Sequence, residues 1–230
     1  MESFDQLVRA VSIFAIPVLF AITLHEAAHG YVARYFGDYT AAAQGRISLN
    51  PLRHIDPIGT ILVPIGLLAL SGGNFLFGWA KPVPVNFSAL RHPKQDMLWV
   101  AAAGPGSNLL QALIWGVVLR VAMLLDGNAL QEPMLLMAAA GIVVNLVLMV
   151  LNLLPLPPLD GGRILVSLLP DRQALQVARV EPFGLLILIV LLVTGLLGAL
   201  LWPLIAGLAS VVGGLFGVSL QQLFGLLSAI

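Results

Sequence analysis

The chain has 230 residues, of which 59% are hydrophobic and only 10% are charged. Soluble domains carry about 25% charged residues, so this composition excludes an ordinary soluble protein and predicts an integral membrane protein. Eleven basic residues balance eleven acidic ones, which leaves no basic surface for nucleic acid, and the absence of cysteine excludes disulfides and thiolate metal ligands.

The first apolar stretch, from about residue 7 to residue 36, contains a charged motif. Between residues 10 and 33 the only formally charged side chain is Glu26, within His25-Glu26-Ala27-Ala28-His29. A carboxylate at membrane depth costs about 2.5–3.5 kcal/mol on insertion scales, so such a residue is expected to be functional. Histidines at i and i+4 share one helical face. This is the H-E-x-x-H pattern of zinc sites, in which the glutamate acts as general base.

Residues 40–90 are predicted to form a β or re-entrant region over this motif. Residues 58–70 are apolar, but they contain two glycines and a proline and are too short for a crossing of about 20 residues. The flanking residues 40–50 and 77–86 have the composition of extended chain, and alternating valine and proline in the second indicates an edge strand. Non-helical backbone at membrane depth must lie against protein or a wet cavity, so we expect this region to pack over the motif.

Further apolar stretches follow, and we expect a single integral membrane domain over residues 1–230. Residues 97–125, 133–154 and 183–201 are predicted to span the membrane, and residues 203–229 either span it or lie along its surface. The expected fold class is therefore an all-α polytopic membrane protein with a small membrane-associated β/re-entrant region.

The basic residues indicate an orientation. If residues 58–70 do not cross, loops 34–57, 71–96 and 155–182 lie on one side and hold nine of the eleven basic residues. The positive-inside rule then places these loops in the cytoplasm and the N-terminus outside. The first ten residues lack a basic segment and a cleavage site, so we expect no removable signal peptide.

Asp160 is the candidate for a third metal ligand, since a catalytic zinc site usually has three protein ligands and an open position. It follows the third predicted span, after prolines that end the helix and before Gly161 and Gly162. Two crossings separate the first and third spans, so His25, His29 and Asp160 can converge at one membrane face. We expect one Zn²⁺ in a core of three transmembrane helices. The alternatives are a hydrogen-bonded polar cluster for the histidines and a turn residue for Asp160.

These motifs resemble those of the site-2 proteases, a family of intramembrane zinc metalloproteases, and specifically its compact bacterial branch without a PDZ domain. Residues 25–29 match the first family motif, and Leu159-Asp160-Gly161 matches the second. Residues 103–108, Ala-Gly-Pro-Gly-Ser-Asn, resemble the G-P-x-x-N segment of the intervening helix. Residues 50–57 and 78–86 resemble further signatures of that branch.

The resemblance covers about residues 10–170 and implies an endopeptidase that cuts membrane-anchored proteins in or near their transmembrane segments. Zinc bound by the three ligands is expected to activate a water, with Glu26 as general base. Asn108, with Gly104 and Pro105, is expected to position the substrate or the oxyanion. The alternative for Asn108 is small-residue packing with an interhelical hydrogen bond.

Further residues are assigned to the neighbourhood of the site. His54 is interpreted as a group that supports a ligand, an extra ligand, or a surface histidine. Trp79, Lys81, Val83 and Val85 are expected to hold an unwound substrate segment by strand addition. Separately, two asparagines of the third span that share a helical face are expected to hydrogen-bond across helices, namely Asn145 and Asn152.

Three other functions compete with the protease. A metal transporter needs polar residues through both leaflets, whereas these ligands cluster at one end of their spans. An inactive relative that only binds helices is disfavoured by the intact Glu26. A membrane zinc protease with a glutamate ligand is disfavoured by the shortage of intramembrane glutamate. The expected partners are lipid and a transmembrane substrate, without nucleic acid; no oligomeric state is predicted.

Overall fold

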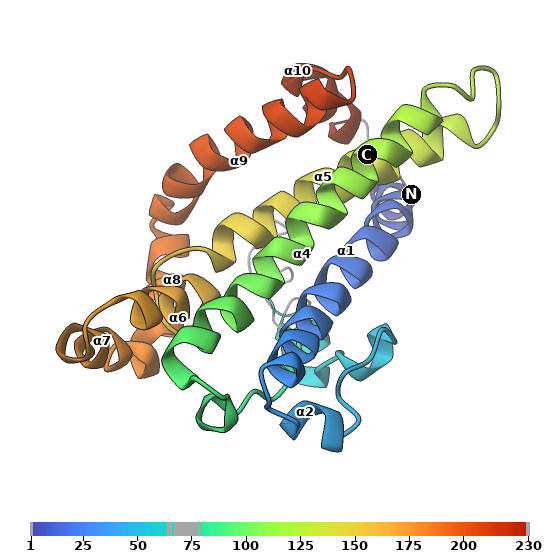
Figure 1. Ribbon diagram of the computed structural model, residues 1–230. Coiled ribbons are helices and arrows are strands. Elements are labelled where there is room, and N and C mark those ends of the chain that lie inside the picture. Colours follow the sequence, from blue (N-terminus) through green and yellow to red (C-terminus); the bar gives the residue numbers. More distant parts are fainter. Residues whose placement is uncertain (1, 64–65, 67–77, 79, 229–230) are drawn as a thin grey trace.

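The computed structural model describes residues 2–63, 66, 78 and 80–228, and this part of the chain is mainly helical (Figure 1). Short helical turns connect the first long helix to the second, and a group of shorter helices follows the third. In chain order the helices are α1 Glu2–Tyr35, α2 Thr40–Ala43, η1 Pro51–Arg53, η2 Pro57–Leu62, η3 Phe87–Ala89, α4 Pro93–Ala122, α5 Gln131–Asn152, α6 Asp160–Leu168, α7 Asp171–Ala178, α8 Glu181–Val193, α9 Leu196–Leu215 and α10 Leu220–Leu227.

Helices α1, α4, α5 and α9 are long and apolar enough to cross a membrane, and α7 with α8 forms a fifth candidate bent by 58°. Helix α4 packs against both α1 and α5, and α1 also packs against α5 (Figure 1). Small residues make this close packing possible. A Cβ on Gly141 of α5 would lie 2.3 Å from the Trp115 ring of α4. The all-α polytopic fold class is thus confirmed in its main outline.

The predicted span over residues 183–201 is not one helix, because the helix is broken within the apolar run. Helix α8 ends at Val193, Gly195 adopts a left-handed conformation with φ 76°, and α9 then begins. Helix α8 alone is shorter than the roughly 20 residues that a crossing needs.

The predicted apolar segment over residues 203–229 is likewise divided. A turn with Gly217 at φ 79° separates α9 from α10. A capping box between Ser219 and Gln222 starts α10. Residues 203–229 are therefore not one continuous helix.

The described part of residues 40–90 contains no strand. Residues 40–43 form a helical turn because Asp38 Oδ1 accepts the Thr40 N–H and three helix-favouring alanines follow. Residues 80–86 form neither a helix nor a ladder, and Pro82 and Pro84 have no N–H to donate to a ladder. The predicted β region is corrected to this extent. Most of the predicted re-entrant stretch after residue 63, and Trp79, lie outside the described residues.

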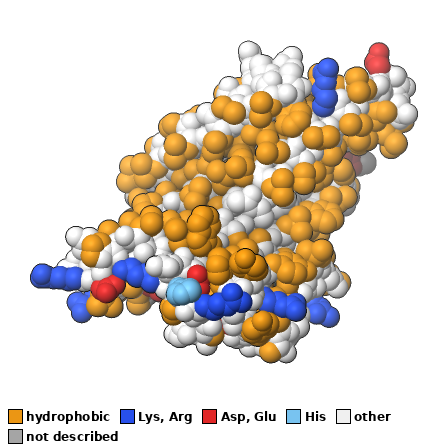
Figure 2. All heavy atoms as spheres, viewed as in Figure 1, with side chains coloured by type: hydrophobic (Ala, Val, Ile, Leu, Met, Phe, Trp, Pro, Cys, Tyr) orange, Lys and Arg blue, Asp and Glu red, His pale blue; other side chains and the backbone are white. Residues whose placement is uncertain are grey.

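Lysine and arginine side chains gather at one end of the molecule (Figure 2). This is the end formed by α2, α6 and α7 (Figure 1), whereas apolar side chains cover the long helices visible on this face. Exposed apolar side chains on α9, such as Leu200 and Trp202, are what a lipid-facing surface requires.

Candidate metal centre

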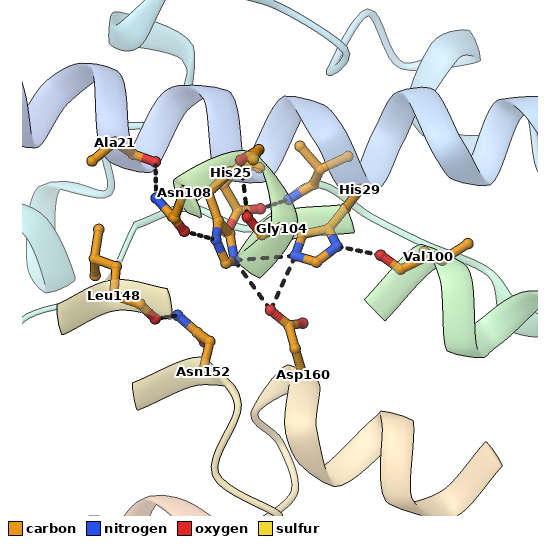
Figure 3. A network of polar contacts seen from close by, with 12 residues as sticks. Ala21, His25, His29, Val100, Gly104, Asn108, Leu148, Asn152 and Asp160 are labelled. Carbon is orange, nitrogen blue, oxygen red and sulfur yellow. Dashed lines mark hydrogen bonds and ion pairs between the residues drawn. The ribbon is translucent and has the colours of Figure 1, made fainter. Parts of the chain in front are cut away.

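His25 and His29 lie one helical turn apart on α1, and both imidazoles point toward the start of α6 (Figure 3). The ring centroids are 4.8 Å apart in an edge-to-face arrangement. The two Nε2 atoms are separated by 3.1 Å, and His25 is only 7% exposed. The i, i+4 spacing therefore brings two ring nitrogens together.

Asp160, the first residue of α6, faces both imidazoles. Its Oδ2 lies 3.2 Å from Nε2 of His25 and 3.4 Å from Nε2 of His29. The turn before α6 is tightly packed, since a Cβ on Gly161 would lie 2.2 Å from the Leu153 carbonyl oxygen. This glycine lets the chain fold back so that Asp160 reaches α1. The three side chains converge as the sequence predicts.

Hydrogen bonds on the far side of each ring set which nitrogen carries the proton. Nδ1 of His29 lies 2.7 Å from the Val100 carbonyl oxygen, which can only accept, so this Nδ1 donates. Nδ1 of His25 lies 2.6 Å from Oδ1 of Asn108 and also donates. In the neutral rings both Nε2 atoms therefore present a lone pair toward Asp160.

The Asp160 carboxylate faces these lone pairs, and as an anion at neutral pH it has no proton to share with them. Its Oδ2 is buried and receives no hydrogen bond within the described part of the chain. Two nitrogen lone pairs and a carboxylate oxygen thus converge with no proton between them, an arrangement that a bound cation stabilises.

The spacing of these atoms fits zinc. Ligand atoms about 2.0–2.1 Å from a tetrahedral metal lie about 3.3 Å from one another, and the observed separations are 3.1, 3.2 and 3.4 Å. The space beside them is kept open by Gly104 of α4 (Figure 3). A Cβ there would lie 2.4 Å from Nε2 of His29 and 2.6 Å from Nε2 of His25. Two nitrogens and one oxygen leave a fourth position for water or substrate.

Glu26 accepts a hydrogen bond from the segment of residues 80–86, which has no regular secondary structure. Its Oε2 accepts the Val83 N–H at 2.7 Å. Asp38 fixes the C-terminal end of this segment, because its Oδ2 accepts the Asn86 N–H at 2.7 Å. Nη2 of Arg46 donates to the carbonyl oxygens of residues 81 and 82. This part of the chain therefore lies beside the metal motif, as the sequence predicts, although not as a strand.

Asn108 is placed differently from its predicted role. Its side chain is fully buried, and its Nδ2 donates to the Ala21 carbonyl oxygen at 3.1 Å and to Oδ1 of Asn145 at 2.9 Å. Both N–H bonds of the amide are used, so none remains for an oxyanion. The interhelical hydrogen bond, the alternative interpretation, is what the structure contains. Of the two asparagines predicted to bond across helices, Asn145 does so, whereas Asn152 donates to the Leu148 carbonyl oxygen of its own helix.

The other predicted residues lie around the centre. Pro105 is buried next to Gly104. His54 is 2% exposed, which excludes a surface histidine, and its Nε2 lies 2.8 Å from the Ser48 carbonyl oxygen. His54 is not part of the group of side chains that could hold a metal ion among the described residues. The Lys81 N–H donates to the His54 carbonyl oxygen, and Val85 packs beside the buried Leu90.

Two comparisons with known proteins give matches. The profile of Peptidase family M50 matches residues 116–195. The "Putative zinc metalloprotease YwhC" of Bacillus subtilis (strain 168) is 42% identical over 198 residues, 83% of this chain and 84% of that protein. Proteins named "Putative zinc metalloprotease Rip2" are 33% identical in Mycolicibacterium smegmatis (76% of this chain, 64% of the relative) and 32% in Mycobacterium tuberculosis H37Rv (75% and 63%). No solved structure matches.

Proposed function

This chain belongs to peptidase family M50, the site-2 protease family, and is a zinc metalloprotease; from this premise we propose that it cuts membrane-anchored proteins in or beside their transmembrane segments. The observation that carries the proposal is the convergence of His25, His29 and Asp160 at the distances of a tetrahedral zinc site. We assign these three residues as the zinc ligands, held by the core of α1, α4 and the turn between α5 and α6.

The proposed chemistry is hydrolysis by an activated water. Zinc, when bound, supplies a Lewis acid that acidifies a water and polarises the scissile carbonyl. Glu26 takes the proton of the attacking water and passes it to the leaving amine as the carbon–nitrogen bond breaks. The hydrogen bond from Val83 restricts the Glu26 carboxylate to one orientation, which leaves its other oxygen to accept this proton.

The substrate must open its helix at the cleavage point, because an intact helix hides its carbonyl groups in internal hydrogen bonds. We propose that the opened strand lies along Val83 and Val85, with Lys81 at the near end. Pro82 and Pro84 have no N–H, so substrate N–H groups must supply much of the pairing by donating to carbonyl oxygens of this segment. The class of substrate is a transmembrane segment rather than a soluble peptide.

The proposed location is the plasma membrane of a bacterium, with the N-terminus outside. The lysine and arginine side chains gather at the end of the molecule that also contains α6, the helix that begins with Asp160 (Figures 1 and 2). The positive-inside rule then puts the zinc ligands toward the cytoplasmic leaflet. A site at that depth is consistent with a substrate that reaches it within the membrane.

Replacement of the general base tests the mechanism. Glu26→Gln should lower cleavage of a fluorescent transmembrane peptide by at least about 100-fold, the low end for losing general-base catalysis. Zinc content per chain should stay at the wild-type level, because Glu26 is not assigned as a ligand. Full cleavage by this variant would contradict the mechanism. Zinc flux into proteoliposomes, measured on the same preparations, would instead support a transporter.

A further inference from the structure

We propose that Asn108 and Asn145 form a hydrogen-bonded relay that holds His25 in its Nδ1–H tautomer and thereby positions it for zinc. The proposal rests on the assignment of His25 as a ligand and deepens it. Neutral imidazole can carry its proton on either nitrogen, and only the Nδ1–H form presents the Nε2 lone pair to the metal. The question is therefore which group in the protein selects that form.

The Ala21 carbonyl on α1 fixes the orientation of the Asn108 amide. A carbonyl oxygen can only accept, so the Asn108 atom 3.1 Å from it must be Nδ2. The oxygen of the same amide is then the atom that lies 2.6 Å from Nδ1 of His25 (Figure 3). Because Oδ1 can only accept, Nδ1 of His25 must carry the proton.

The Gly141 carbonyl fixes Asn145 in the same way. Nδ2 of Asn145 donates to this carbonyl oxygen, one turn earlier on α5, at 2.8 Å. Its Oδ1 therefore faces Asn108 and accepts the second N–H of that amide at 2.9 Å. Each bond in the relay has one allowed direction, and the direction is set by helix carbonyls at both ends.

Burial makes this selection effective. Asn108 and Asn145 are both fully buried, and His25 is 7% exposed, so water does not offer an alternative partner to the two amides. A flipped amide would place an N–H toward an N–H and an oxygen toward a carbonyl, which is costly inside a protein. The relay also joins α1, α4 and α5, so packing of the three helices is coupled to the state of one metal ligand.

His29 provides an internal reference. Its Nδ1 donates to the Val100 backbone carbonyl, a partner that changes in Asn108 or Asn145 leave in place. The two histidines thus differ in what selects their tautomer, although both turn Nε2 to the same point. A substitution in the relay should therefore change the tautomer of His25 and leave the tautomer of His29 unchanged.

The direct test is ¹⁵N NMR of histidine-labelled, zinc-free protein in detergent, at a pH well above the ordinary histidine pKa of about 6.5. Wild-type His25 should show the Nδ1–H pattern. Asn108→Leu, nearly isosteric but unable to accept a hydrogen bond, should move His25 toward Nε2–H while His29 stays unchanged. An unchanged His25 spectrum would overturn the proposal. Asn108→Ala serves as the second variant if the leucine variant does not fold, with the same two readings.

Zinc affinity, measured by competition with a chelator, supplies a second test. Asn108→Leu should weaken it about 10–100-fold, as loss of a group that supports a histidine ligand does, and Asn145→Leu should weaken it less. Asn145→Leu should cause no further loss in the Asn108→Leu background, because the relay is already broken. If the fold-losses in zinc affinity of the two single variants multiplied in the double variant, the relay would be overturned.

Thr194→Val is the control for these measurements. It removes a side-chain hydrogen bond to the Val190 carbonyl on α8, outside the relay, and should leave zinc affinity unchanged. The outcomes separate the relay from the proposed function. If wild-type protein holds His25 as Nδ1–H but binds no zinc, the protease assignment fails and the tautomer selection stands.

Discussion

Gly104 stands where a side chain and a metal would compete for the same space. A Cβ at this position would lie 2.4 Å from Nε2 of His29 and 2.6 Å from Nε2 of His25, closer than any unbonded carbon and nitrogen can approach. The imidazoles are movable ends of side chains, so Gly104→Ala should fold while its rings swing away from Asp160. We expect zinc binding to be lost and the zinc-free protein to be less stable than the wild type, since the displaced rings strain their buried hydrogen bonds to Asn108 and to the Val100 carbonyl.

The matched control is two residues further along the same helix. A Cβ on Gly106 would meet no atom within 4 Å, so Gly106→Ala should bind zinc like the wild type. Zinc per chain by elemental analysis and unfolding temperature by light scattering check both variants. Zinc binding by Gly104→Ala at wild-type affinity would show that the metal does not lie between these rings.

At the residue scale, the sequence indicates the proposed ligands but not the groups that orient them. His25, His29 and Asp160 are predictable because charged and polar residues are rare and costly in apolar segments, so each one is conspicuous. The role of Asn108 is not, because an amide can donate or accept and only its neighbours in space decide which. The space left by Gly104 is equally a property of the folded structure.

At the scale of elements, α8 supports the turn that leads into Asp160. Gly184 of α8 packs so closely that a Cβ there would lie 1.8 Å from the Pro157 carbonyl oxygen. This neighbour is backbone and cannot rotate away, so Gly184→Ala should displace α8 or the turn and cost about 1–3 kcal/mol of overpacking. We expect a lower unfolding temperature together with a zinc affinity reduced about 10-fold, as for a ligand that has lost its support.

Gly198 provides the comparison for this prediction. It lies in α9, and a Cβ there would meet no atom within 4 Å. Gly198→Ala should therefore keep the zinc affinity and the unfolding temperature of the wild type. If Gly184→Ala behaved in the same way, the contact between α8 and the turn would not be needed to hold Asp160.

The predicted helix boundaries agree with the structure where the composition changes along the chain, and differ from it where the composition stays the same. Helices α1, α4 and α5 are bounded by polar or proline-containing segments, so apolar length locates them within a few residues. The break at Gly195 lies inside a continuous apolar run and gives no contrast, so the sequence predicts one span over residues 183–201 where the structure has parts of α8 and α9. Residues 40–43 form a helical turn, and Asp38 Oδ1 accepts the Thr40 N–H at its start, a contact that alternation of residue types does not reveal.

At the scale of the whole molecule, the candidate metal centre lies toward the same end as most of the basic side chains. Asp160 begins a helix at the end of the molecule where the basic side chains gather, and Glu132, at the other end of α5, pairs with Arg9 at 2.6 Å. The loop between α4 and α5, which contains Asp126, leaves the bundle at that second end (Figure 1). Each end of the helix bundle therefore has exposed residues that can be labelled to show on which side of the membrane it lies.

The absence of cysteine from the chain makes the orientation directly measurable, because each introduced thiol is then unique. Asp126→Cys and Gln173→Cys both lie at exposed positions, in the α4–α5 loop and on α7. With the zinc ligands toward the cytoplasm, a membrane-impermeant maleimide should label Asp126→Cys in intact cells and Gln173→Cys only after permeabilisation. Both variants should keep protease activity, which reports that they are correctly inserted. The opposite labelling pattern would place the zinc ligands and the cleavage reaction near the outer leaflet.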